Sequence, residues 1–313
     1  MKILVLGTGG VGGYFGGRLA AAGADVTFVA RGRHLRALKE NGLRVESGLG
    51  NLHLKPVRAT DDPAEAGVAD VVMIAVKLWD TESAAQAAAP AVGPETAVVS
   101  FQNGVDAVEI LTRTFGAARV MGGVAHIAAF IESPGVIRHN GTLARLTFGE
   151  LDGSRSPRAE RLLAACQAAG FDTVLSDNVQ RVIWEKFVFI VGLSGLTTLT
   201  RLPIGPIREE PLTRALLADV MREAAAVGRA KGVDLPGDTA ERQVAFADTL
   251  PHGMIASMLG DLRRGNRLEL PWLTGAVVRL GRELGVATPA NAFVYAALKL
   301  HAEGRHPDAG EPA

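Results

Sequence analysis

A glycine-rich turn near the start of the chain constrains the fold more than any other sequence feature. Gly7, Gly9 and Gly12 follow a short apolar run and have the spacing of a dinucleotide-binding turn. These positions suit a tight turn, close approach of the backbone to a pyrophosphate, and close packing of the next helix on the strand. We therefore predict a strand, this turn, a helix over 10–22 whose first amides face the phosphates, and a second strand over 25–30. The alternative is a glycine-rich turn without a ligand.

The residues that we expect to contact the dinucleotide at this turn are Gly7, Thr8, Gly9, Gly10, Val11 and Gly12.

The end of the second predicted strand indicates which dinucleotide is bound. NAD enzymes tend to place a carboxylate there to bind the ribose hydroxyls. Here Arg31 and Arg33 follow the strand, and Asp25 lies at its wrong end. Guanidinium groups suit a 2′-phosphate, so we predict NADP(H) with Arg31 as the main contact. The alternative is that both arginines are solvated loop residues.

Composition limits the classes of partner and compartment. The 33 basic and 33 acidic residues balance, so we expect neither nucleic acid nor a membrane surface as partner. The single cysteine, Cys166, excludes an internal disulfide and fits a reducing compartment. No uninterrupted apolar run approaches the length of a membrane span, and the chain starts directly on a predicted core strand. We therefore expect a cytoplasmic protein, and we expect no bound metal.

Hydrophobic periodicity divides the chain in two. Strand-like alternation ends near Ser176, and helical periodicity dominates from there to His301. We predict an α/β fold with an N-terminal Rossmann domain over 1–176, an all-helical domain over 177–302 and a disordered tail over 303–313. An exposed apolar surface on the helical domain would allow a homodimer.

Two polar residues follow later strands of the predicted sheet. Lys77 follows the apolar segment 70–76, and Asn103 follows the strand 96–100. Because parallel sheets bind ligands at the carboxyl ends of their strands, we expect both side chains to contact cofactor or substrate. The alternatives are an exposed lysine and an Asn-Gly turn without a ligand.

A lysine in an apolar helix is the first candidate for acid–base chemistry. The pattern predicts one buried helix over 179–199 that carries Lys186 near its start. Burial of an ammonium group is costly unless it pairs with an acid, reaches solvent along its own stem or serves a site. Desolvation also lowers the pKa of a lysine toward values useful in proton transfer. A lysine that reaches solvent is the alternative.

Ser257 and Glu269 form a second candidate group. In one unbroken helix, twelve residues would separate them by about 18 Å, too far to share a small substrate. Gly265 and Asn266 offer a break, and Pro271 suits the first turn of a new helix. A turn there would return Glu269 toward Ser257. The alternative is a surface helical hairpin with a solvated Glu269.

Together these residues resemble the ketopantoate reductase (2-dehydropantoate 2-reductase) family over nearly the whole chain. The ordered set of Lys186, Ser257 and Glu269 is far more specific than the glycine motif, which many families share. The features that carry the resemblance are Gly7-x-Gly9-x-x-Gly12, Arg31, Val76-Lys77-x-Trp79, Asn103-Gly104, Trp184-x-Lys186, Ser257-Met258-Leu259-x-Asp261 and Glu269.

The resemblance implies a cleft between two domains in which NADPH reduces a 2-oxo acid to a 2-hydroxy acid. The family reaction converts ketopantoate to pantoate in pantothenate and coenzyme A biosynthesis. Carried over to this chain, Lys186 is the general acid, Glu269 its charge partner, and Ser257 a ligand of the substrate carboxylate. Lys77 and Asn103 are contacts to cofactor and substrate. The substrate-binding set is Asn103, Lys186, Ile190, Ser194, Ser257 and Glu269.

This chain departs from the family at the substrate tail. The family often has asparagines four and eight residues after the lysine, where this chain has Ile190 and Ser194. Ile204 likewise stands where an asparagine is common before Gly205. A more apolar wall makes a 2-oxo acid with an apolar tail a second hypothesis, since lost hydrogen bonds to a substrate hydroxyl cost discrimination. A third hypothesis is an NADP-binding sensor without catalysis.

Overall fold

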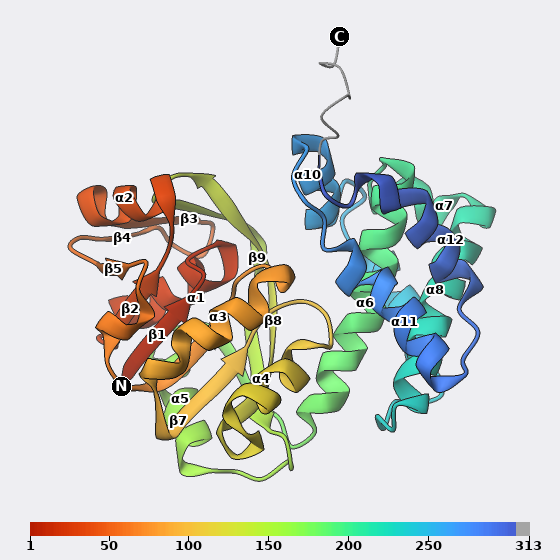
Figure 1. Cartoon of the computed structure of the whole chain (residues 1–313). Coiled ribbons are helices and arrows are strands. Elements are labelled where there is room, and N and C mark those ends of the chain that lie inside the picture. The colour runs from red at the N-terminus through yellow and green to blue at the C-terminus, as the bar shows by residue number, and fades with distance from the viewer. Residues whose placement is uncertain (305–313) are drawn as a thin grey trace. The chain divides into compact units, whose positions relative to one another are not determined.

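In the computed structural model, which describes residues 1–304, the N-terminal segments form one ten-stranded mixed sheet. Chain contacts define two units. Unit 1 comprises Met1–Gln102 and Asp106–Val182, and unit 2 comprises Asn103–Val105 and the chain from Ile183 onward. Figure 1 shows the strands of unit 1 in red to yellow-green and the helices of unit 2 in green to blue. The predicted α/β class with a helical C-terminal region is confirmed.

The strands of unit 1 are β1 (Lys2–Leu6), β2 (Asp25–Val29), β3 (Leu43–Ser47), β4 (Leu52–Leu54), β5 (Arg58–Thr60), β6 (Ala69–Ile74), β7 (Val92–Ser100), β8 (Val120–Ser133), β9 (Val136–Glu150) and β10 (Asp172–Leu175). Its α-helices are α1 (Gly10–Ala21), α2 (Gly32–Asn41), α3 (Thr81–Ala88), α4 (Ala107–Phe115) and α5 (Pro157–Ala168). Short 3-10 turns are η1 (Pro63–Ala66), η2 (Leu78–Asp80), η3 (Ala89–Ala91) and η4 (Ala117–Arg119).

The strand order β4-β3-β9-β8-β7-β6-β1-β2-β5 explains where a ligand can bind. Strands β5, β2, β1, β6 and β7 are mutually parallel, and the chain reverses its direction of travel across the sheet between β1 and β6. Loops that leave the carboxyl ends of strands at such a reversal diverge and leave a binding crevice. The glycine turn follows β1, and Lys77 follows β6.

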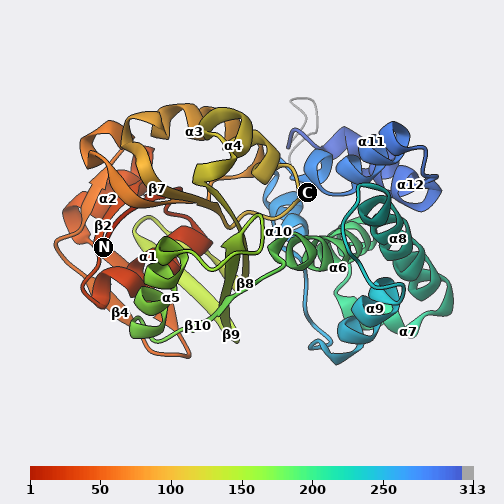
Figure 2. The same ribbon diagram turned by 90° about the horizontal axis from the view of Figure 1, so that it is seen from below.

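Alternating side chains of the central strands build two separate cores. Val5 and Met73 face a core closed by α1 and α5, whereas Leu4 and Val72 face one closed by α3 and α4. Figure 2 shows α3 and α4 on one side of the sheet and α1 and α5 on the other. A parallel sheet covered on both faces needs near-continuous apolar strands, as in the run 3–6.

The longest strand of the sheet is interrupted by a bulge. Strand β9 contains both 136–139 and 145–148 and pairs antiparallel with β8. The register jumps because Asn140 lies opposite Ala128 and Ala144 opposite Ile127, so residues 141–143 bulge out. Gly141 has a φ of +77°, a left-handed conformation that glycine adopts readily.

Gln102 ties together the loops that follow β6 and β7. Its Nε2 group donates to the Val76 carbonyl at 2.9 Å and to Thr81 Oγ1 at 2.9 Å. Its Oε1 accepts from Ser100 Oγ at 3.0 Å. The Thr81 hydroxyl donates its own hydrogen to the Leu78 carbonyl, so its oxygen can only accept, and the NH2 group of Gln102 must face it. The amide of Gln102 therefore fixes the backbone immediately before Lys77.

Unit 2 is entirely helical over its described residues. Its α-helices are α6 (Val179–Thr200), α7 (Ile204–Glu209), α8 (Pro211–Ala230), α9 (Thr239–Thr249), α10 (Ser257–Arg264), α11 (Thr274–Leu284) and α12 (Pro289–Leu298), and its 3-10 turns are η5 (Leu270–Trp272) and η6 (Lys299–His301). Pro271 thus lies in a 3-10 turn that begins at Leu270, rather than in the first turn of a new α-helix as we predicted, and α11 starts three residues after Pro271, at Thr274.

Helix α6 is the core helix of unit 2, although its first residues belong to unit 1. It packs closely on α8, since a Cβ atom on Gly192 would lie 2.5 Å from the Met221 side chain. Trp184 of α6 is buried against Gly228, which also lies on α8. By length and composition alone α6 could cross a membrane, since an 18-residue stretch of it has a mean hydropathy of 1.5. However, 67% of that stretch is buried inside the protein. This burial is typical of a core helix.

The predicted domain boundary at 176–177 precedes α6, whereas the contact division falls within it. Of the predicted tail, residues 303 and 304 are described, and 305–313 lie outside the described residues.

Candidate functional site

The glycine turn after β1 has the geometry that its sequence predicts. Gly7 has a φ of +94°, and a Cβ atom there would lie 2.7 Å from the backbone of Ala75. Gly12 allows close packing, because a Cβ atom there would lie 2.2 Å from the Gly7 carbonyl oxygen and 2.8 Å from Val5. The turn therefore lies directly against the loop that follows β6.

Gly9 differs from its neighbours, because no protein contact requires a glycine there. A Cβ atom on Gly9 would meet no described atom within 4 Å. The residue is the N-cap of α1, and no side chain caps this helix within the described chain. The first intrahelical bond recorded at this end runs from Gly13 N to the Gly9 carbonyl at 2.7 Å. The amides of Gly10, Val11 and Gly12 thus remain available at a positive helix end, which suits a phosphate.

Gly10 serves a purpose that the sequence did not indicate. A Cβ atom there would lie 2.0 Å from the Ala129 carbonyl of β8. Close packing of α1 on β8 therefore requires this glycine, whether or not a dinucleotide is bound.

Thr8 supports the turn from within. Its hydroxyl and its amide both donate to the Val29 carbonyl, at 2.9 Å and 3.1 Å, and the residue is 2% exposed. Its carbonyl accepts from His34 Nε2 at 2.8 Å. The recorded bonds of Thr8 are all internal, so its contribution to the turn is structural, and a direct contact with the dinucleotide stays a prediction.

His34 was not identified from the sequence. Its Nδ1 accepts from the Gly135 amide at 3.1 Å, so its Nε2 must carry the hydrogen donated to the Thr8 carbonyl. Burial lowers the pKa of His34, and the bond to Thr8 opposes this effect. The neutral imidazole therefore joins the glycine turn to the β8–β9 connection. No local pattern could have indicated a contact that spans 101 residues.

The arginines after β2 are exposed. Arg31 is the N-cap of α2, and Gly32 follows with a φ of +56°. Within residues 1–304, neither Arg31 nor Arg33 has a recorded side-chain partner. Two exposed guanidinium groups at the end of β2 leave donors available for an anion.

Lys77 lies after β6 with its Nζ 5.7 Å from the centroid of the Trp79 ring. Its extended backbone, with a ψ of 151°, precedes the turn η2. The predicted Lys77 contact with the cofactor stays a prediction.

Unit 2 brings together three of the predicted catalytic and substrate residues. Lys186 Nζ donates to Asn103 Oδ1 at 2.9 Å, although the residues are 83 positions apart. Burial lowers the pKa of Lys186 to about 8, and the charge of Glu269 acts in the opposite direction. Val105 packs on the core of unit 2, which explains why the segment Asn103–Val105 belongs to this unit.

Glu269 is 8% exposed and lies between two fully buried leucines, Leu268 and Leu270. Helix α10 ends before it at Gly265, which caps the helix in a left-handed conformation with a φ of +70°. The predicted break at this glycine is confirmed. Ser257 is the exposed first residue of α10, and no side-chain bond of Ser257 is recorded within residues 1–304. Its contact with a substrate carboxylate stays a prediction.

The residues predicted to line the substrate tail differ in exposure. Ile190 and Ser194 follow Lys186 at intervals of four on one face of α6. Ile190 is partly exposed, but Ser194 is 1% and Ile204 0% exposed. Ile204 is part of the helical core, so a packing role explains it without a ligand. Of Ile190, Ser194 and Ile204, Ile190 is therefore the one whose side chain is exposed enough to contact a substrate.

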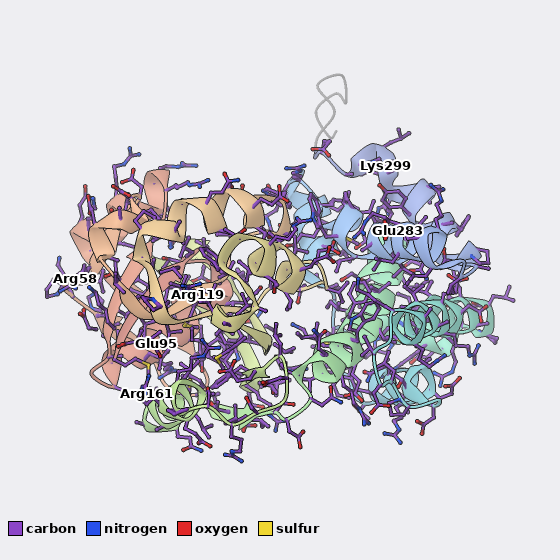
Figure 3. All side chains as sticks on the ribbon, turned by 60° about the horizontal axis from the view of Figure 1, so that its bottom comes forward. Arg58, Glu95, Arg119, Arg161, Glu283 and Lys299 are labelled. Carbon is purple, nitrogen blue, oxygen red and sulfur yellow. The ribbon has the colours of Figure 1, made fainter. Side chains whose placement is uncertain are left out.

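A hollow of about 500 Å³ on unit 1 is not this site. Glu95 and Arg161, labelled in Figure 3, contribute to its lining, and none of the predicted site residues does. Its buried charges are already paired, because Arg158 donates to both oxygens of Glu150. Among residues 1–304, no group of three or more His, Cys, Asp or Glu side chains could hold a metal.

Comparison with known proteins agrees with this arrangement. The family model described as ketopantoate reductase PanE/ApbA matches residues 3–153, and the model of the C-terminal domain of that family matches residues 178–302. A 2-dehydropantoate 2-reductase of Mesorhizobium japonicum is 34% identical, over 96% of this chain and 97% of its own length. An uncharacterized oxidoreductase of Bacillus subtilis, YkpB, is 33% identical, over 96% of this chain and 99% of its own.

Solved structures extend the likeness to the fold. A PanE/ApbA family ketopantoate reductase from Ralstonia eutropha has a TM-score of 0.88 at 36% identity, covering 96% of this chain and 98% of that one. D-mandelate dehydrogenase, solved with NADH and anilino(oxo)acetate, has the same TM-score at 22% identity, which shows a shared fold. Both family models and relatives above 30% identity span this chain, and it therefore belongs to the ketopantoate reductase family of oxidoreductases.

Proposed function

We propose that this protein reduces a 2-oxo acid to a 2-hydroxy acid with NADPH, and that 2-dehydropantoate is its substrate. Pantoate, the product, would serve pantothenate and coenzyme A biosynthesis in the cytoplasm. The observation that carries the proposal is the ammonium group of Lys186, held 2.9 Å from Asn103 Oδ1 and under the influence of the Glu269 charge. Relatives named 2-dehydropantoate 2-reductase, at 32–34% identity, support the choice of substrate.

The residues of this chain fit a bound dinucleotide. The open position at Gly9 and the uncapped amides of Gly10, Val11 and Gly12 would hold its pyrophosphate. When bound, the reduced nicotinamide supplies a hydride to C2 of the oxo acid. Exposed guanidinium groups at Arg31 and Arg33 favour a 2′-phosphate over the bare ribose of NADH.

Lys186 would supply the proton. As C2 gains the hydride, its carbonyl oxygen takes up the electron pair of the C=O bond and becomes basic. The Nζ group of Lys186 donates a hydrogen bond to that oxygen and then transfers the proton. Asn103 accepts another Nζ hydrogen and so orients the ammonium group. Glu269 keeps the lysine protonated against the effect of burial.

Ile190 favours a second substrate class. A partly exposed isoleucine one helical turn after Lys186 offers no hydrogen bond to a substrate hydroxyl. A 2-oxo acid with a branched apolar tail, such as 2-oxoisovalerate, would fit such a wall.

Replacement of the lysine tests the function. Lys186→Ala should lower kcat with the best 2-oxo acid about 100-fold or more, because the acid acts in the transition state, and should leave the Kd for NADPH unchanged. The best substrate comes from a screen of 2-oxo acids that follows NADPH oxidation. Lys231→Ala, at an exposed lysine of unit 2, is the control. Retention of most of the turnover by Lys186→Ala would reject the general-acid role.

The cofactor assignment is tested at Arg31. Arg31→Ala should raise the KM for NADPH about tenfold, since charge-assisted bonds to a phosphate are lost, and should leave the KM for NADH nearly unchanged. Arg161→Ala removes an exposed guanidinium elsewhere on unit 1 and should change neither value. Equal increases for both cofactors after Arg31→Ala would disprove the phosphate contact.

The substrate class is tested at Ile190. Ile190→Asn should raise the ratio of kcat/KM for ketopantoate to that for 2-oxoisovalerate about fivefold, because it restores a hydrogen-bonding group near a substrate hydroxyl. Ile190→Val keeps the wall apolar and should preserve the ratio. An unchanged ratio in Ile190→Asn would place this residue outside the substrate site.

A further inference from the structure

The segment that contains Glu269 is held by the last described residues of the chain. We call Gly265–Leu268 the approach loop, since it joins the end of α10 to Glu269, and Ala302–Gly304 the C-terminal brace. All three residues of the brace contact the approach loop, and both segments belong to unit 2. The contacts involve a backbone bond, an ion pair and close packing.

The first contact is a backbone hydrogen bond. The amide of Leu268 donates to the Ala302 carbonyl at 2.8 Å. Both residues are buried, with Leu268 0% and Ala302 1% exposed. Water therefore cannot easily take the place of either partner, and loss of the bond would leave a buried polar group unsatisfied. The bond acts on the residue immediately before Glu269.

The other two contacts extend the brace along the loop. Arg267 Nε lies 3.1 Å from Glu303 Oε2. This ion pair is exposed, at 40% and 73%, and therefore contributes little alone. Gly304 packs more closely, because a Cβ atom there would lie 2.8 Å from the Gly265 carbonyl oxygen and 3.3 Å from Arg267 N. Its φ of +92° also favours glycine.

The opposite end of the approach loop is held by α10. The Asp261 carbonyl accepts from Asn266 N at 2.9 Å, and Asp261 Oδ1 accepts from Asn266 Nδ2 at 3.1 Å. Asp261 therefore holds the start of the approach loop at Asn266, whereas the brace holds its end at Leu268, next to Glu269. Without the brace, the Leu268 amide would lose its hydrogen bond to the Ala302 carbonyl. The backbone of Leu268 immediately precedes Glu269, so its position sets the direction of the Glu269 side chain.

We infer that the C-terminal brace is a positioning element for Glu269, which it holds in place to act on Lys186. This inference deepens the proposed function, on which it rests for the catalytic role of Lys186. The charge of Glu269 raises the pKa of Lys186 against the effect of burial. Displacement of the carboxylate should therefore lower the pKa of the lysine.

Gly304→Ala tests the inference, with Gly285→Ala as the matched control. Both glycines have a positive φ, of +92° and +70°. A Cβ atom on Gly304 would press on the approach loop, whereas one on Gly285 would meet nothing within 4 Å. The control thus carries the backbone strain without the displacement. A chain that ends at Gly304 and one that ends at His301 provide a second pair, with and without the brace.

The readout is the pKa of Lys186, from the pH dependence of its acetylation by acetic anhydride followed by mass spectrometry. Exposed Lys39 in the same samples is the internal reference. In Gly304→Ala and in the chain ending at His301, the midpoint for Lys186 should move to lower pH, and acetylation at pH 7 should be about threefold faster. Gly285→Ala and the chain ending at Gly304 should match the parent protein.

A folded Gly304→Ala variant, checked by circular dichroism, with the midpoint of the parent protein would overturn the inference. The same result in a folded chain ending at His301 would overturn it independently. The measurement needs no turnover. If no 2-oxo acid is reduced, the proposed function fails while the positioning of Glu269 is still decided.

Discussion

The hydrogen bond from Lys186 to Asn103, beside the charge of Glu269, is the interaction on which the proposed reaction depends. Burial alone would favour a neutral amine, which cannot protonate a carbonyl oxygen. The carboxylate of Glu269 opposes burial, and the resulting pKa of about 8 leaves a lysine that is protonated at neutral pH yet can release its proton readily. Three distant segments of the chain must fold together to produce this balance.

The glycine turn of unit 1 leaves backbone amides uncovered at the start of α1, as the proposed binding of a pyrophosphate requires. Gly7 turns the chain and Gly12 brings the helix close, and only glycine fits at either position because neighbouring atoms occupy the space that a side chain would need. Gly9, in contrast to Gly7 and Gly12, has open space where a side chain would lie. The buried hydrogen bond of Thr8 and the partly buried hydrogen bonds of His34 and Gln102 hold the surrounding loops in place without a ligand.

Local sequence patterns predicted much of the fold and of the candidate site. Features that depend on contacts between distant residues could not be predicted in this way. Glycine spacing predicted the left-handed Gly7, and an apolar helix with one lysine predicted a partly buried Lys186 whose pKa is lowered by desolvation. His34 and the C-terminal brace could not be predicted, because each depends on a tertiary contact with no periodic pattern. Ile204 was assigned to the substrate wall by resemblance, but it lies in the core because the short helix α7 packs there. Roles in binding also require the ligand, so those of Ser257 and Lys77 remain predictions.

The pH dependence of kcat tests the central role of Lys186 most directly. A general acid with a pKa of about 8 is protonated below that pH and loses its proton above it. We therefore predict that kcat for the best 2-oxo acid is constant near neutral pH and falls tenfold per pH unit well above pH 8, provided that chemistry limits turnover. In Glu269→Gln this fall should begin at lower pH. A kcat that held to about pH 10, near the ordinary pKa of lysine, or a fall that Glu269→Gln left in place, would contradict the assignment.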